Sequence, residues 1–311
     1  MELDQAAEYL RSHDQYRLVT HRRPDGDTLG SAGALCHALR RMGKTAFLYP
    51  NAEATETYAP FLTDYMEPGS FSPATTIAVD VAEAGILCKD FDGNIDFWID
   101  HHATRKAPRE PGLIRPERAA CGELVQELIE LMLGRPDKVE ADLLYMAVST
   151  DTGCFLYANV NADTFRCAAR LLEYGADQKR LNKLLFRTKT RARLLLEGEI
   201  YRTLLSYRND ALNIAGVTLD MLRRCGVTEN DLDDIANLPG QVAGNRVNAI
   251  VRELAPGRCK VSLRTDGGVD ASAVCARFGG GGHRMASGCE LELPPEEAAE
   301  AIRAAVEEVW A

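Results

Sequence analysis

Long apolar runs are absent from this sequence of 311 residues. None approaches the roughly 20 residues that a helix needs to cross a bilayer, so we expect no membrane partner. The pattern of a signal peptide is absent as well, because the first ten residues, MELDQAAEYL, are acidic and amphipathic. The nine cysteines are odd in number and show no CxxC spacing. We therefore expect reduced thiols and a cytoplasmic protein.

Positive charge is scarce too. The 36 lysines and arginines are outnumbered by 46 aspartates and glutamates, which gives a formal net charge of −10. This balance argues against a protein that grips long duplex DNA or RNA. It leaves room for a small anionic substrate, because bound metal ions and a few arginines can reverse the local sign of the charge. The 46% hydrophobic and 26% charged composition is typical of a globular enzyme.

Histidine is also rare, with six in the chain. We interpret His13, near the N-terminus, and His37, in an expected helix, as structural residues. The other four lie in polar clusters rich in glycine or aspartate: His21, His101, His102 and His283. Their shared setting makes them candidates for a metal or phosphate site.

The hydrophobic patterns predict an α/β protein of two domains. The first is expected to have a mostly parallel sheet flanked by helices, and the second a smaller α/β fold with a mixed sheet. The strands of the first are expected at 16–20, 44–49, 75–81 and 95–100, and those of the second at 211–218, 247–254, 260–265 and 286–293. We place the boundaries at 1–187 and 209–311, with a helical linker at 188–208.

Polar residues follow three of the expected strands of the first domain. His21, Asp25 and Asp27 follow the strand at 16–20, in a segment that Pro24 and Gly26 mark as a turn. The other two strands end at Asp80 and at Asp100-His101-His102, and the helix at 139–149 runs into Asp151. A parallel sheet collects such strand ends at one edge, where open α/β sheets bind their ligands.

Carboxylates and imidazoles in this number suit two divalent cations that share a bridging carboxylate. The alternative is a set of unrelated loop-capping acids, and for the first cluster alone an ordinary turn is an equal interpretation. The helix expected at 28–42 begins with small residues, which permit close approach to the sheet or to a ligand. Its free N-terminal amides would favour a phosphate.

The segments THRRPDGDTLGS, AVDVAE, IDHHATR and STDTGCF resemble, in this order, the four motifs of the DHH phosphoesterase superfamily. FGGGGHRMASG resembles the GGGH signature of the DHHA1 domain. The order of these motifs and the two-domain size of the chain are similar to those of the NrnA-type subfamily, whose members are oligoribonucleases that also dephosphorylate pAp. The resemblance implies a DHH catalytic domain, a DHHA1 substrate-binding domain and an active site in the interdomain cleft.

The resemblance also implies roles for single residues. Two ions, usually Mn²⁺ with Mg²⁺ or Co²⁺ as options, would be bound by His21, Asp25, Asp27, Asp80, His101 and Asp151. Asp80 would bridge the ions, His102 would face the scissile phosphate, and Asp100 would orient an imidazole. The substrate-binding residues would be Arg264, Gly280, Gly281, Gly282, His283 and Ser287. The roles of Arg105, Phe155 and Tyr157 stay open; the two aromatic residues are either core residues or platforms for a base.

We therefore expect a hydrolase that cuts short RNA or DNA oligonucleotides to mononucleotides and converts pAp to AMP and phosphate. A homodimer is a further expectation of the resemblance. Three alternatives remain: a hydrolase dedicated to linear dinucleotides from cyclic-dinucleotide turnover, an inorganic pyrophosphatase, and a nucleotide-binding sensor without activity. The pyrophosphatases of the superfamily lack the GGGGH signature, and a full set of metal ligands argues against a sensor.

Overall fold

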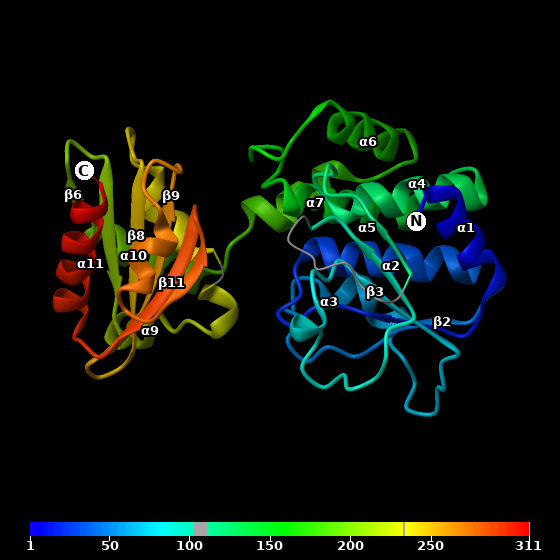
Figure 1. The fold of residues 1–311 in the computed structure, drawn as a ribbon, viewed down its shortest axis with the longest axis horizontal. Helices are drawn as coiled ribbons and strands as arrows, with labels where there is room; N and C mark the ends of the chain where they lie inside the picture. Colours follow the sequence, from blue (N-terminus) through cyan, green and yellow to red (C-terminus); the bar gives the residue numbers. More distant parts are fainter. Residues whose placement is uncertain (103–110, 233, 311) are drawn as a thin grey trace. The chain divides into compact units, whose positions relative to one another are not determined.

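The computed structural model describes residues 1–102, 111–232 and 234–310. The chain forms two compact units, Met1–Thr188 and Lys189–Ala311. Both are α/β, as predicted, and each is described by itself below (Figure 1). Among the described residues, no helix combines the length and the apolar character that a membrane span requires.

The first unit is built on a five-stranded sheet of order β2-β1-β3-β4-β5 in which every pairing is parallel. The strands are β1 (Tyr16–Val19), β2 (Ala46–Leu48), β3 (Thr75–Val79), β4 (Phe97–Asp100) and β5 (Gly112–Ile114). The first four were predicted; β5 was missed because three residues carry no usable pattern. The chain order reverses between β1 and β3, and such switch points bind ligands in open α/β sheets.

Helices cover one face of this sheet (Figure 1). Those that contact its strands are α1 (Leu3–Ser12), α2 (Gly26–Arg41) and α4 (Cys121–Leu133). A further layer packs on these helices: α3 (Ala59–Leu62) and α5 (Lys138–Asp151) on α2, and α6 (Ala162–Glu173) and α7 (Gln178–Asn182) on α5. Leu18, Ile77 and Phe97 pack with these helices in the main core. Ala78 and Trp98 point to the opposite face, where a smaller core lies. Burial of both faces explains why β3 and β4 are apolar runs rather than alternating ones.

The small residues at the start of α2 serve contact between helices. A Cβ on Gly30 would lie 2.4 Å from the carbonyl oxygen of Leu143 in α5, and one on Gly26 would lie 2.4 Å from the Thr150 hydroxyl. The two glycines thus permit close packing of α2 on α5. The expected approach to the sheet occurs as well, because the hydroxyl of Thr28 donates to the carbonyl of Val79 in β3 at 2.8 Å. The expected phosphate site is corrected, because the Asp25 carboxylate accepts the amide hydrogens of Asp27 and Thr28.

Gly30→Ala is therefore expected to destabilise the first unit, although alanine is the better helix former. The added methyl group meets backbone that cannot move aside, and overpacking of this kind costs about 1–3 kcal/mol. The control is Gly198→Ala in α8 (Arg191–Arg202), where nothing lies within 4 Å of the new Cβ and a gain of about 1 kcal/mol is expected. Urea unfolding of both variants measures the difference; equal effects would contradict the packing argument.

The second unit contains a six-stranded mixed sheet of order β10-β11-β9-β8-β7-β6. Its strands are β6 (Leu205–Tyr207), β7 (Leu212–Val217), β8 (Val247–Ala255), β9 (Arg258–Thr265), β10 (Gly281–His283) and β11 (Ala286–Leu291). Only β7 and β8 pair in parallel. The predicted helical segment 188–208 is wrong at its end, because α8 stops at Arg202 and β6 begins at Leu205.

Helices pack on both faces of this second sheet. α10 (Ala271–Ala276) and α11 (Pro295–Val309) cover one face, around Ala249, Val261 and Leu263. On the other face, α8 and α9 (Leu219–Cys225) pack near Ala215 and Ile250 together with the 3₁₀ segment η5 (Ile235–Gln241). The sequence missed α9, η5 and β10, which are all short.

Candidate metal centre

The predicted ligands of the first unit converge at the carboxyl end of its sheet. His21 and Asp80 follow β1 and β3, whereas Asp100 ends β4 and His101 comes next. Asp151 is the last residue of α5. Residues up to 130 positions apart in the sequence, from His21 to Asp151, thus share one edge, as the parallel sheet predicts.

The side chains form two groups that meet at Asp80. The Nε2 atom of His21 lies 3.7 Å from Asp25 and 3.8 Å from Oδ2 of Asp80. The Nε2 atom of His101 lies 3.4 Å from Oδ1 of the same aspartate. It also lies 3.7 Å from Asp27 and from Asp151. Ligand atoms lie within 4.8 Å of one another in three overlapping sets: His21, Asp25 and Asp80; Asp27, His101 and Asp151; and Asp80, His101 and His102.

Backbone carbonyls fix the tautomers of the two imidazoles. Nδ1 of His21 lies 2.8 Å from the carbonyl oxygen of Arg22, and Nδ1 of His101 lies 3.1 Å from that of Arg118. Each Nδ1–H therefore donates to a carbonyl, and Nε2 is the ring nitrogen that faces the carboxylates. Metal-binding histidines are oriented in this way.

Asp27 is held by a part of the chain that the sequence did not associate with it. Its carboxylate accepts the amide hydrogens of Cys121 at 2.7 Å and Gly122 at 2.9 Å, in the first turn of α4. The hydroxyl of Ser31 donates to it at 3.0 Å. The free amides of a helix N-terminus stabilise a carboxylate, so α4 fixes this predicted ligand in place.

The buried carboxylates lie close to one another, and both burial and mutual repulsion disfavour their charged forms. Burial and the charges of Asp151 and Asp25 raise the pKa of Asp27 well above its usual value. Burial and the charge of Asp27 do the same to the pKa of Asp80. Oδ1 of Asp80 is buried and accepts no hydrogen bond from any described residue. Cations between these groups would remove the repulsion, so the donor set fits two hard divalent ions.

His102 occupies a different position from His101. Its Nδ1 lies 2.8 Å from Oδ1 of Asp100, which also accepts the backbone amide hydrogens of His101 and His102. The hydrogen bond to Asp100 raises the pKa of His102. The Asp100 carboxylate therefore orients this imidazole and favours its protonated form.

In the second unit, strand register places Arg264 and His283 on one face of the sheet. Ala286 pairs with Arg264 in β9 and with His283 in β10, and residues that pair directly share a face. Gly281 and Gly288 form the next pair on this face. Ser287 lies on the opposite face beside Leu263, and its hydroxyl donates to the carbonyl of His283 at 2.9 Å.

The predicted glycines differ in what they do. A Cβ on Gly280 would lie 2.3 Å from the carbonyl oxygen of Gly288, and one on Gly282 would lie 2.7 Å from that of Ala286. These two glycines therefore permit close contact with β11. A Cβ on Gly281 would meet nothing within 4 Å, so this is the glycine beside open space. Arg105 lies outside the described residues.

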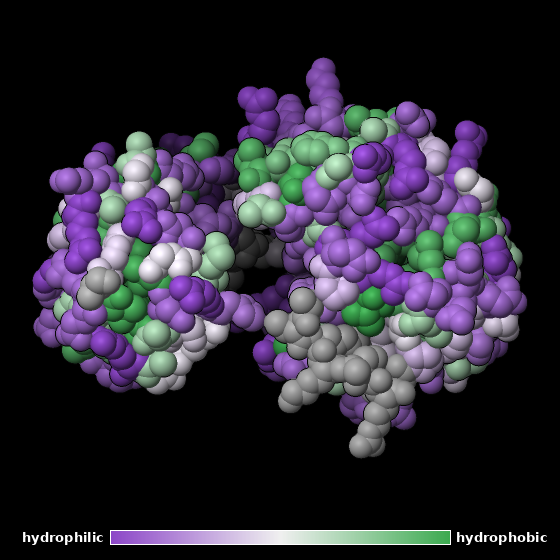
Figure 2. Space-filling view, turned by 45° about the horizontal axis from the view of Figure 1, so that its top comes forward, coloured by the Kyte–Doolittle hydropathy of each residue, from purple (hydrophilic) through white to green (hydrophobic). Residues whose placement is uncertain are grey.

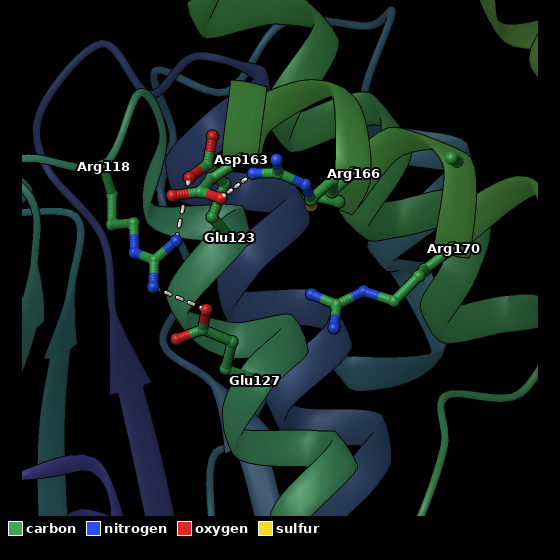
Figure 3. Close-up of a pocket in the computed structure, with 8 residues that line it drawn as sticks. Arg118, Glu123, Glu127, Asp163, Arg166 and Arg170 are labelled. Atoms are coloured by element: carbon green, nitrogen blue, oxygen red, sulfur yellow. Dashed lines mark hydrogen bonds and ion pairs between the residues drawn. The ribbon is translucent and has the colours of Figure 1, made fainter. Parts of the chain in front are cut away.

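A cavity of about 480 Å³ lies between α4 and α6, away from the predicted residues (Figure 3). Its arginines are paired: Arg118 lies 2.6 Å from Glu127, Arg166 lies 2.6 Å from Asp163, and Arg170 of α6 lies 3.2 Å from Glu130 of α4. We interpret the lining as a network of ion pairs that joins α6 to α4. Its connection to the metal centre is the Arg118 carbonyl that accepts from His101.

Two family matches divide the chain as the structure does. Residues 16–148 match the DHH family, N-terminal domain, and residues 214–311 match the DHHA1 domain. Together with the relatives below, they confirm the resemblance that the sequence motifs indicated: the chain belongs to the DHH family of phosphoesterases.

Within that family, the chain is similar to the bifunctional oligoribonuclease and PAP phosphatase NrnA of Thermus thermophilus. The two are 33% identical over 299 residues, which cover 94% of this chain and 89% of the relative. A probable enzyme of the same name from Streptococcus mutans is 27% identical over 90% of each chain. The crystal structure of an exopolyphosphatase-related protein from Bacteroides fragilis has the same fold, with a TM-score of 0.86, 24% identity, and 98% of this chain and 95% of that one covered.

Proposed function

We propose that this phosphoesterase hydrolyses short oligonucleotides to mononucleotides and pAp to AMP and phosphate. The observation that carries the proposal is the position of Asp80 between two groups of possible ligands. Its carboxylate lies 3.8 Å from Nε2 of His21 and 3.4 Å from Nε2 of His101. The names of the relatives support the substrate class. The odd number of cysteines without CxxC spacing supports the proposed cytoplasmic location.

In the proposed mechanism, His21, Asp25 and Asp80 hold one divalent cation, and Asp27, Asp80, His101 and Asp151 hold the other. Two such cations, proposed to be Mn²⁺, would activate water and neutralise the charge that develops on the phosphate oxygens. His102, oriented through Nδ1 by Asp100, would present Nε2 to the substrate. A raised pKa favours its protonated form, which donates a hydrogen bond or a proton to a phosphate oxygen.

The half-buried Arg264 and the exposed His283 are proposed to bind the substrate's phosphate. A guanidinium binds phosphate through parallel hydrogen bonds, and Gly281 and Gly288 leave the adjacent surface free of side chains. Ser287, on the opposite face, would act by holding the turn that carries His283.

Arg264→Ala and His283→Ala are each expected to raise KM for a dinucleotide about 10- to 100-fold, with a smaller change in kcat. Loss of a hydrogen bond to a charged group costs about 1.5–3 kcal/mol, which corresponds to this range. Steady-state kinetics on pApA measures the change. The control is Arg223→Ala, an exposed arginine of α9. An unchanged KM in both variants would remove the second unit from substrate binding.

One comparison separates the proposed function from the alternatives. Purified protein with Mn²⁺ is assayed on pAp, linear dinucleotides, a five-residue RNA, a longer RNA and pyrophosphate. We expect hydrolysis of the first three at comparable efficiency. Activity confined to linear dinucleotides would favour a role in cyclic-dinucleotide turnover, activity confined to pyrophosphate would identify a pyrophosphatase, and binding without turnover would indicate a sensor.

A further inference from the structure

The segment that follows Asp151 has an unusual backbone. Gly153, Cys154 and Phe155 have φ values of 54°, 57° and 67°, three left-handed residues in succession. Non-glycine residues rarely adopt this conformation, and it persists where surrounding contacts fix it. Strain of this kind concentrates at functional sites, so the segment is a candidate for a role beside the metal centre.

Contacts on both sides fix this segment to the centre. The side-chain amide of Asn159 donates to the carbonyl of Asp151 and to that of Ala119, each at 3.1 Å. Ala119 lies just before the first turn of α4, whose amides hold Asp27. The segment is thus attached to two elements that carry or position the proposed ligands.

The two aromatic residues of the segment differ in their surroundings. Phe155 is partly buried, stacks on Phe165 of α6 at 5.7 Å and also lies near Tyr145. It therefore anchors the segment to the core, which resolves the question that the sequence left open for this residue. Tyr157 is 51% exposed.

The ring of Tyr157 packs on the backbone of Gly153. A Cβ on Gly153 would lie 2.3 Å from Cε1 of Tyr157 and 2.4 Å from Cζ, so a side chain there would displace the ring. Gly153 is two residues from Asp151, and two residues span at most about 7 Å of chain. Tyr157 is therefore an aromatic side chain beside a proposed metal ligand, with one side supported by backbone and half of its surface exposed.

Exposed apolar side chains occur in the same segment and in α6. Leu156 is 84% exposed and Phe165 is 56% exposed. Hydrophobic residues gather over α6 and the segment before it on the face in Figure 2. An apolar surface with an exposed ring favours a flat, uncharged group over another phosphate.

We propose that Tyr157 is a stacking platform for a base of the nucleotide whose phosphate lies at the metal centre. It is a positioning residue that gives the enzyme its preference for nucleotides over phosphoesters without a base. This inference rests on the proposed function. Stacking accepts any base, so it predicts little discrimination among the four bases.

Tyr157→Ala tests the inference in the full-length protein. Loss of one stacked base corresponds to about a 5- to 100-fold rise in KM for pApA, with kcat changed much less. Tyr157→Phe keeps the ring and should retain wild-type KM. For an analogue of pApA that lacks both bases, wild type and Tyr157→Ala should have the same KM. Tyr201→Ala, an aromatic residue of α8 with 39% exposure, is the control for truncation of an exposed ring.

Equal KM values of wild type and Tyr157→Ala for pApA would overturn the inference. So would a rise in KM of Tyr157→Ala for the analogue that is as large as its rise for pApA. Binding measurements test the stacking role of Tyr157 independently of the proposed hydrolytic function. Calorimetry should show that wild type prefers AMP to ribose 5-phosphate and that Tyr157→Ala loses this preference. A Tyr157-dependent preference in a protein that hydrolyses no oligonucleotide would sustain the stacking role and refute the proposed function; no Tyr157 dependence would refute the stacking role alone.

Discussion

Asp80→Asn is expected to lower kcat/KM on pApA by about 1,000-fold or more. The Asp80 carboxylate lies 3.8 Å from Nε2 of His21 and 3.4 Å from Nε2 of His101, so an amide in its place weakens both proposed sites. Bound metal contributes several kcal/mol to transition-state stabilisation, and about 4 kcal/mol corresponds to this factor. Wild-type activity in this variant would refute the dinuclear proposal.

Asparagine is a better replacement than alanine because Asp80 has a φ of 57°. Among residues with a side chain, asparagine adopts this left-handed conformation most readily, so the fold should be retained. The metal-free variant should even melt at a higher temperature than the metal-free wild type, because a buried, repelled charge is removed. Asp163→Asn, an exposed acid in the first turn of α6, is the control and should retain activity. Low activity together with a lower melting temperature would indicate misfolding instead.

Chelation is expected to abolish activity and to give the metal-free protein a characteristic pH dependence. The pKa values of Asp27 and Asp80 are raised in the folded state, mainly by burial, whereas aspartates in the unfolded chain titrate near 4. The folded state therefore binds more protons than the unfolded state above that pH, and stability falls as pH rises through the folded pKa values. The metal-free protein should melt at a higher temperature at about pH 5.5 than at about pH 8.

Mn²⁺ should reverse this trend. The ligands bind metal in their deprotonated form, so the rise in melting temperature on adding Mn²⁺ should grow with pH. Thermal melts with chelator and with Mn²⁺, at several pH values, measure both effects. Asp80→Asn should flatten the pH dependence of the chelated protein. If the chelated wild type has the same melting temperature at every pH, the pKa values of these carboxylates are not raised in the folded state.

The sequence predicted the strands that deliver His21, Asp80 and His101, and the reason is physical. A buried parallel strand is a short apolar run, and a ligand at its end interrupts the run with a charged or imidazole side chain, so both features are visible in the residue types. Asp151 was visible as the acid into which the helix expected at 139–149 runs. The edge at which these residues meet then followed from parallel pairing.

Features that depend on backbone groups were not predictable. The amides of Cys121 and Gly122 hold Asp27, but every residue except proline has an amide, so no residue type marks this role. The close contact of Gly30 with α5 depends on which helices are neighbours. β5 and β10 have three residues each, too few to show a period. The role of Asp25 as N-cap of α2 is different, because aspartate is a preferred residue before a helix and the residue type does mark this role.

The attachment of Asp27 to α4 has a consequence for synthesis of the chain. A nascent polypeptide that has grown to residue 100 already carries His21, Asp25, Asp27 and Asp80. It still lacks the two amides that hold Asp27, and it lacks Asp151. A further 51 residues must be synthesised before Asp151 is present, so the proposed second cation site can form only after α5 is complete.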